Sequence, residues 1–578
     1  MNQNTEKICF LRIKSFIILF FLILVGLLAW ITYGTLEGIV GMLSYLIIGF
    51  VGLYPWIIPY VGIVFGFLDL FNVLNIGLYS ASLEIARLSG SWMSVSWFCI
   101  TSLLGIIINL IFSLYITIKL RDLKNREKSD LKNYALKNCN IINGKKNSDI
   151  LHNGIILIDN SQKDNNKEFG IIEAIGREGE IEIPKDYDII DLRNKYILPG
   201  LINAHCHLTG SGKPMKIMNL SDEMMEFGSR LLKNKLVQFI LKRILRKNAL
   251  TALNAGITTL RSMGDPEYLD VKLRKEIEKG GILGPRLLVS GPGICTTGGH
   301  GGPMSYVADS VAEIRKAVRK NLRNEVDLIK ILSTGGVMDA RNIGEAGRPQ
   351  MTVEEISTAC SEAHRGGLLV ATHCESTKGI KEALKGGVDT VEHGAEIPDD
   401  LVPLFKENPK SLRGYTALIS TLSAGMGLAT LEPEVTKITD VKFENAKLIE
   451  QGMIQGFRKA YKKGIKIGCG TDASVPFSTH YNFWKELLYY TKYSDMSTQE
   501  AIHMGTLNNA KILGIDHITG SIEKGKSADL IVVPENPYND IEILSNVERI
   551  FIRGHFIKNP EIKKVKDVEK VPFPPLEI

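Results

Sequence analysis

The sequence predicts an α/β protein, a (β/α)8 TIM barrel with a small composite β-sandwich domain, preceded by an all-α transmembrane region. Three observations predict this architecture. In the middle of the 578-residue chain, short apolar runs alternate with amphipathic helical stretches. Short strand-like runs flank this region on both sides, and the residues before about position 118 are strongly apolar.

Residues 1–132 are predicted to form a transmembrane region of about four helices. Apolar segments cover residues 16–33, 38–53, 57–79 and 97–118, and the second is short for a span of ~20 residues. Basic residues precede the first segment and follow the last, so both flanks are expected on the cytoplasmic side. We therefore expect a multi-pass protein of the cell membrane, in contact with membrane lipid, whose catalytic part faces the cytoplasm. Two crossings are the alternative.

Two sets of short strands are expected to pair into one composite β-domain. The first set lies in residues 133–198 and the second in residues 519–578, and turn residues such as Asn143 and Gly144 separate the strands. Pairing of the two sets brings together the ends of the central region, residues 199–518, which is predicted to be the barrel.

The central region contains eight near-continuous apolar runs, as in a parallel sheet covered on both faces. They are residues 201–207, 257–261, 286–290, 328–332, 368–373, 390–393, 417–421 and 465–470. Helical stretches such as 311–322, 354–365 and 377–385 fall between them. In such barrels the active site lies at the C-terminal ends of the strands.

Side chains that can bind metal gather where these strands end. His205 and His207 are two residues apart in a strand and therefore share a face. Four further candidates on other strands are Lys330, His373, His393 and Asp472. Each has an ordinary structural explanation by itself, but their joint placement favours a metal site. Mixed nitrogen and oxygen ligands suit zinc, and also manganese, iron or cobalt.

Five motifs carry a resemblance to a known family: PGLINAHCHL, DLIKILSTGGV, ATHCES, TVEHG and GTDA. They resemble the metal-dependent amidohydrolase superfamily, in its branch of Xaa-Pro dipeptidase-like and imidazolonepropionase-like hydrolases. The resemblance covers the chain from Tyr134 to about residue 560. It implies a binuclear centre of two divalent ions, zinc by default. His205, His207 and Asp472 would hold the first ion, and His373 and His393 the second.

The resemblance also implies that Lys330 bridges both ions as a carboxylated lysine. A neutral lysine amine reacts with carbon dioxide to give an anionic carbamate, and burial supplies the neutral amine. If Lys330 is instead a plain lysine paired with a carboxylate, a single-metal site is expected.

A metal-bound hydroxide attacking a carbonyl needs a proton acceptor, and Asp472 is the candidate catalytic acid and base. A glycine-rich loop, residues 293–302, contains His300, a second catalytic candidate. In the resembled family the corresponding histidine contacts substrate, so two roles are open for His300: polarising the scissile carbonyl or holding a substrate carboxylate. Arg341 is a further candidate for substrate binding.

The predicted function is a membrane-anchored, metal-dependent hydrolase of C–N bonds, acting on an amide, dipeptide-like or cyclic amide substrate. A mononuclear deaminase or cyclic-amidine hydrolase is one alternative, and a catalytically silent membrane-bound scaffold or sensor is another. The net charge of +6 comes without a basic run interleaved with aromatics, which argues against nucleic acid. The 8 cysteines are scattered, as in a reducing compartment. A homo-oligomer, the substrate and the role of the 215–247 insertion stay open.

Overall fold

The computed structural model describes residues 132–161, 170–215 and 222–571. Within these ranges no helix is long and apolar enough to cross a membrane. This finding corrects the expectation of a multi-pass cell-membrane protein that contacts lipid and faces the cytoplasm, and that expectation is withdrawn. The four segments predicted to span, between residues 16 and 118, lie outside the described residues.

Eight parallel strands form the barrel in the predicted order. They are β6 (Leu201–Cys206), β7 (Ile257–Ser262), β8 (Arg286–Val289), β11 (Leu328–Leu332), β12 (Leu369–Cys374), β13 (Thr390–His393), β14 (Ala417–Ser420) and β15 (Ile467–Cys469). Neighbouring strands pair in parallel within β6–β8 and within β11–β15. Each lies within two residues of its predicted bounds, because each is a short apolar run bounded by turn residues.

Two backbone hydrogen bonds close the ring of strands. Asp327 donates its N–H to the carbonyl of Val289 at 2.8 Å, which joins β11 to β8. At the other seam Thr471, just after β15, donates to the carbonyl of His205 in β6 at 3.0 Å. The short strands β9 (Ile294–Cys295) and β10 (Tyr306–Val307) extend the sheet beside β11. The second seam places the loop after β15 directly beside the His-x-His strand.

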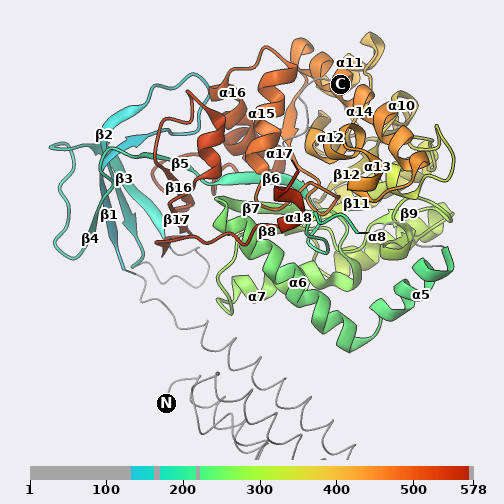
Figure 1. Ribbon diagram of the computed structural model, residues 1–578, viewed down its shortest axis with the longest axis horizontal. Coiled ribbons are helices and arrows are strands. Elements are labelled where there is room, and N and C mark those ends of the chain that lie inside the picture. Colours follow the sequence, from blue (N-terminus) through green and yellow to red (C-terminus); the bar gives the residue numbers. More distant parts are fainter. Residues whose placement is uncertain (1–131, 162–169, 216–221, 572–578) are drawn as a thin grey trace, which may run out of the picture. The chain divides into compact units, whose positions relative to one another are not determined.

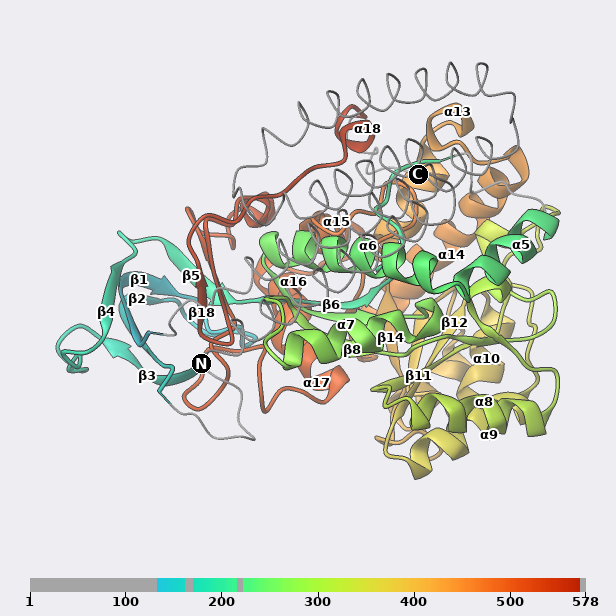
Figure 2. The same ribbon diagram turned by 90° about the horizontal axis from the view of Figure 1, so that it is seen from below.

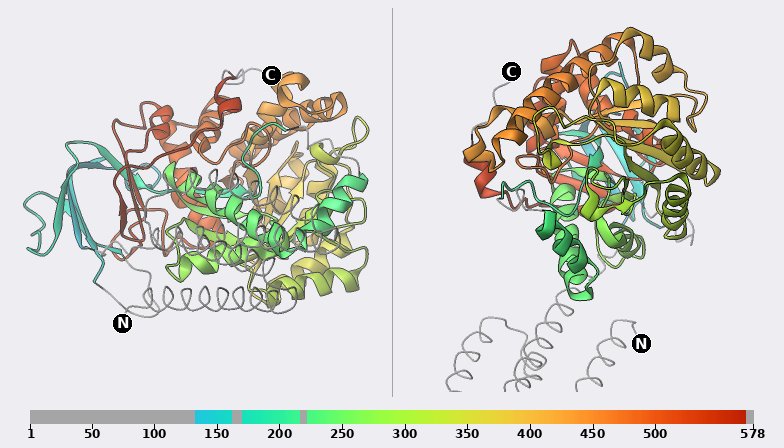
Figure 3. Two further views of the ribbon diagram at one scale, coloured as in Figure 1. Left: turned by 60° about the horizontal axis from the view of Figure 1, so that its bottom comes forward. Right: turned by 90° about the vertical axis from the view of Figure 1, so that its right-hand side faces the viewer.

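Helices surround the strands, as the right-hand view of Figure 3 shows. The predicted helices correspond to α8 (Val311–Arg323), α9 (Val353–Arg365) and α10 (Thr377–Gly386). Each begins at a Ser or Thr whose hydroxyl accepts a backbone N–H, which satisfies a free donor of the first turn. The others are α7 (Leu269–Glu278), α11 (Val402–Lys406), α12 (Leu422–Thr430), α13 (Pro433–Thr436), α14 (Asp440–Lys463), α15 (Phe483–Tyr493), α16 (Thr498–His503), α17 (Asn509–Leu513) and α18 (Lys566–Glu569).

The 215–247 insertion contributes α5 (Asp222–Leu232) and the first part of α6 (Lys235–Asn254), seen end to end in Figure 2. The C-terminal half of α6 is buried, through residues such as Leu245 and Leu253. Phe227 and Leu236 are exposed on the insertion itself. The insertion is therefore anchored to the barrel by the end of α6.

The flanking strands form one eight-stranded sheet beside the barrel (Figure 1). Its strands are β1 (Tyr134–Ile141), β2 (Leu151–Asp159), β3 (Ile171–Arg177), β4 (Asp188–Asp191), β5 (Tyr196–Pro199), β16 (Leu530–Val533), β17 (Arg549–Ile552) and β18 (His555–Ile557). β5 and β16 pair antiparallel, which joins the two flanks. The sheet bends back until Ile172 donates to the carbonyl of Lys526 at 2.8 Å. The described strands thus make one curled sheet instead of the two separate sheets of the predicted sandwich.

Candidate metal centre

The first half of the candidate site is built from β6 and the loop after β15. His205 Nε2 lies 3.3 Å from Asp472 Oδ1, and His207 Nε2 lies 3.2 Å from the same oxygen. Two ligands of a tetrahedral zinc ion, each at ~2.0–2.1 Å, are about 3.3 Å apart. His205 Nε2 and Asp472 Oδ1 are both buried without a hydrogen-bond partner. These unpartnered lone pairs at ligand spacing fit a shared cation.

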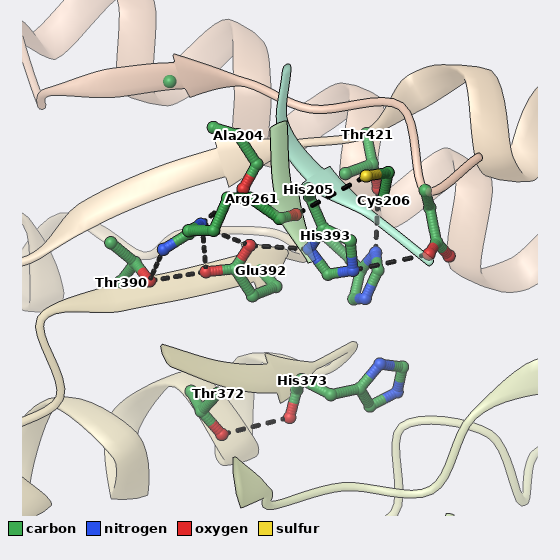
Figure 4. Close-up of polar contacts among 12 residues, drawn as sticks. Ala204, His205, Cys206, Arg261, Thr372, His373, Thr390, Glu392, His393 and Thr421 are labelled. Carbon is green, nitrogen blue, oxygen red and sulfur yellow. Dashed lines mark hydrogen bonds and ion pairs between the residues drawn. The ribbon is translucent and has the colours of Figure 1, made fainter. Parts of the chain in front are cut away.

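The second half is built from the ends of β12 and β13. The His373 and His393 ring centroids are 4.6 Å apart, and His205 and His393 are 4.8 Å apart. Ligand-type atoms of His205, His393 and Asp472 all lie within 4.8 Å of one another. The same holds for His373, Glu375 and His393, so His393 belongs to both groups. Figure 4 shows His205 and His393 side by side.

The backbone is strained at two of these residues. His393 has φ 67° and Asp472 has φ 50°, in the left-handed region that costs side-chain-bearing residues of order 1–3 kcal/mol. His393 is the last residue of β13 and Asp472 comes three residues after β15, so both lie at a strand end. Such strain persists where the surroundings fix it, and it is common at functional sites.

The site favours the protonation states that metal ligands need. Burial holds the pKa of His373 and of His393 well below the ordinary value, so both rings are neutral. Burial raises the pKa of Asp472, but the imidazoles of His205 and His207 outweigh it and hold the pKa well below its usual range. Neutral imidazole and ionised carboxylate are the forms that bind divalent ions.

Lys330 stands in the middle of β11, 2% exposed. Burial lowers the pKa of its amine to about 8, although the Glu392 and Asp472 carboxylates oppose this shift. Within the described ranges no carboxylate oxygen lies within 4.0 Å of its Nζ. A buried lysine with a lowered pKa and no paired carboxylate supplies the neutral amine that carbamate formation requires.

A buried carboxylate that the sequence did not single out holds His205 in place. Glu392 Oε2 is 2.6 Å from His205 Nδ1, and Arg261 Nη2 donates to both Glu392 oxygens at 2.8 Å (Figure 4). Arg261 also donates through Nε to the carbonyl of Ala204. The pKa of Glu392 is held far below its usual range, because the charge of Arg261 and the bond to His205 outweigh burial. With Nδ1–H bonded to Glu392, His205 presents Nε2 to the site.

His300 lies in the loop before η4 (Gly302–Met304). Its ring stacks on His373 at 4.1 Å, and its Nδ1 contacts Asp339 of η5 (Val337–Asp339). Burial lowers the pKa of His300, but the Asp339 carboxylate outweighs it and raises the pKa above its ordinary value. Arg341 is exposed and is not among the lining residues, so the structure does not bring this predicted residue to the site.

A cavity of about 250 Å³ opens over these side chains. Five predicted residues line it: His207, His300, His373, His393 and Asp472. Apolar side chains also line it, among them Met304, Leu428, Ile449 and Met453. A carbonyl compound in this cavity would meet both polar and apolar side chains, which is the usual make-up of a small-molecule site.

A closed parallel barrel with these groups at the C-terminal strand ends defines a metal-dependent hydrolase of the amidohydrolase type. The profile of the Amidohydrolase family matches residues 196–557, and the chain belongs to that family. The predicted family and enzyme class, an amidohydrolase acting on carbon–nitrogen bonds, are confirmed. The comparisons lend no support to the added N-terminal membrane region.

The chain is similar in sequence or structure to the following three proteins, among others. A Bifidobacterium longum protein provisionally named a prolidase is 38% identical, with a TM-score of 0.65, over 76% of this chain and 98% of its own. A Xaa-Pro dipeptidase crystallised with methionine in its active site is 31% identical, with a TM-score of 0.62, over 74% of this chain and 100% of its own. Ochratoxinase of Aspergillus niger is 25% identical over 438 residues, 70% of this chain and 84% of that enzyme.

Proposed function

We propose that the chain hydrolyses the amide bond of a dipeptide-like substrate with two divalent ions, zinc by default, and that residues 199–518 are its catalytic domain. One observation carries this proposal. His205 Nε2 and Asp472 Oδ1 are buried, lack hydrogen-bond partners and lie 3.3 Å apart, and Asp472 lines the cavity. The resemblance to a Xaa-Pro dipeptidase over its full length supports the dipeptide-like substrate.

The proposed ligands divide into two sets. His205, His207 and Asp472 would hold one ion, His373 and His393 would hold the other, and a carbamate on Lys330 would be a ligand of both. Ions bound there supply Lewis acidity, which acidifies a water molecule and polarises a carbonyl. The Arg261–Glu392 pair fixes the ring of His205, as carboxylates do for metal-binding histidines elsewhere.

In this proposal Asp472 transfers the proton and His300 binds the substrate carbonyl. Asp472 takes a proton from the attacking water and returns it to the leaving amine. His300 polarises the scissile carbonyl, because its stacking on His373 places it within one ring of the proposed ligands. The charge of Asp339 raises the pKa of His300, which favours the protonated ring that this hydrogen bond needs.

Metal analysis combined with an amide panel tests the proposal. The full chain is stripped, reloaded with zinc with or without bicarbonate, and assayed on dipeptides and N-acyl amino acids. We expect two ions per chain and hydrolysis only with bicarbonate, and loss of ~10²–10⁴-fold in rate for Asp472→Asn. One ion per chain with unchanged activity after bicarbonate removal contradicts the bridging carbamate. Hydrolysis by Asp472→Asn at the wild-type rate contradicts the mechanism.

A further inference from the structure

One carboxylate at the cavity has no role in the chemistry above. Glu375 follows the last residue of β12, and it lines the cavity. Its side chain is 9% exposed, and Oε2 is buried without a hydrogen-bond partner. Its backbone N–H is donated to Thr334 Oγ1 at 3.1 Å, so the residue is held in place while its carboxylate end is not.

Two other carboxylates near the site have donors, whereas the buried Asp472 Oδ1 has none and is assigned to a metal ion. Glu392 binds Arg261 and His205, and Asp339 binds His300 and the N–H of Gly301. A buried polar oxygen without a donor costs about 1–3 kcal/mol. Glu375 therefore fits a position whose donor arrives with a ligand.

The position of Glu375 indicates which donor that is. Its Oε2 lies 3.7 Å from His373 Nε2, longer than the 3.2 and 3.3 Å separations that converge on Asp472 Oδ1. In a dipeptide the α-ammonium nitrogen is two bonds from the scissile carbonyl carbon. A carbonyl seated over the imidazole cluster thus carries its ammonium to the neighbourhood of His373, where Glu375 stands.

We propose that Glu375 is the anchor for the free α-ammonium group of the substrate, so that the enzyme prefers dipeptides with an unblocked amino terminus to neutral amides. This rests on the proposed function. The ammonium donates to the unpartnered Oε2, and the substrate side chain lies against the apolar side chains of Met304, Leu428 and Met453.

Paired substrates test this selectivity on the zinc-loaded full chain. They are the best dipeptide of the panel and its des-amino analogue, in which hydrogen replaces the ammonium. We expect the wild type to favour the dipeptide by at least ~10-fold in kcat/KM, as one charge-assisted bond allows. Glu375→Gln should lose about 10- to 100-fold on the dipeptide, mainly in KM, and leave the analogue unchanged. Glu375→Asp should recover part of the loss.

One control variant and the paired substrates separate the possible failures. Glu382→Gln, the same change on α10 away from the cavity lining, should behave as wild type on both substrates. An equal loss on both substrates, or a lower zinc content in Glu375→Gln, overturns the anchor. If the wild type cleaves both substrates equally well, the proposed ammonium anchor is wrong, but the proposed amide hydrolysis is still supported. A zinc-loaded chain that cleaves neither refutes the proposed function, and the anchor falls with it.

Discussion

At the scale of single residues, Glu392 connects the metal site to the barrel. Its carboxylate pairs with Arg261 on β7 and accepts the Nδ1–H of His205 on β6 (Figure 4). Its position beside His393 follows from the strand, but its partners come from distant runs of the chain. The TVEHG motif contains Glu392, but only the register of the strands shows which residues its carboxylate binds.

Glu392→Gln is expected to weaken metal binding. An amide still accepts from His205 but leaves the buried Arg261 uncompensated, which costs about 3–5 kcal/mol of stability. The dissociation constant for zinc should rise about 10- to 100-fold, measured by chelator competition. Thr390→Val removes the hydroxyl that donates to Glu392 and accepts from Arg261 but leaves both charges in place, and it is the milder control. Lower stability with unchanged zinc affinity would make Glu392 a structural residue only.

The buried His480 is expected to make the protein less stable in acid. It is 2% exposed, its Nε2 is 2.8 Å from the carbonyl of Gly210, and its Nδ1 has no partner. Burial lowers its pKa from 6.5 to about 4. Between those values the unfolded chain binds a proton that the folded chain rejects. Stability should fall by about 1.4 kcal/mol for each pH unit below 6.5 until about 4.

His480→Asn keeps a donor for Gly210 and removes the titration. Denaturant unfolding measures the free energy of unfolding between pH 7 and pH 4. Its slope against pH should be shallower in the variant by the equivalent of about one proton. The comparison at pH 8, where both side chains are neutral, measures any packing defect separately. Parallel slopes for variant and wild type would mean that His480 does not titrate in this window.

At the scale of elements, the sequence predicted what short-range patterns control. All eight barrel strands and three helices were located, because apolar runs and amphipathic stretches are local patterns. The sequence did not predict that the flanking strands curl into one sheet. That curl depends on hydrogen bonds between residues far apart in the chain, such as Ile172 and Lys526. The exposed position of Arg341 could not be predicted for the same reason, because its distance in sequence from Lys330 does not determine how the loop turns.

Helix α14 is pressed against the segment that follows His393. A Cβ at Gly456 would lie 2.0 Å from the carbonyl oxygen of Ala395, whereas one at Gly452 would meet nothing nearer than 3.7 Å. Gly456→Ala should therefore lower stability by about 1–3 kcal/mol. Gly452→Ala should raise it by up to about 1 kcal/mol through helix propensity. Denaturant melts of the pair measure both, and a stabilised Gly456→Ala would show that α14 can move away.

At the scale of the whole molecule, the barrel brings together groups that the chain keeps far apart. His205 and Asp472 are joined at the seam where β6 meets the end of β15, and Asn203 reinforces it by accepting from the N–H of Thr471 at 3.2 Å. A cation shared across this seam would connect the first and last strands of the ring. Metal binding and closure of the barrel are then coupled.

Removing the ions should consequently destabilise the whole barrel. A ligand at 1,000 times its dissociation constant stabilises the folded state by about 4.1 kcal/mol per site, which the chelated protein loses. The melting temperature should fall by several degrees on chelation and recover with zinc and bicarbonate. Calcium, which prefers oxygen ligands, should not restore it. Asp472→Asn should show a smaller shift. Equal melting temperatures for stripped and reloaded protein of differing zinc content would refute the coupling across the seam.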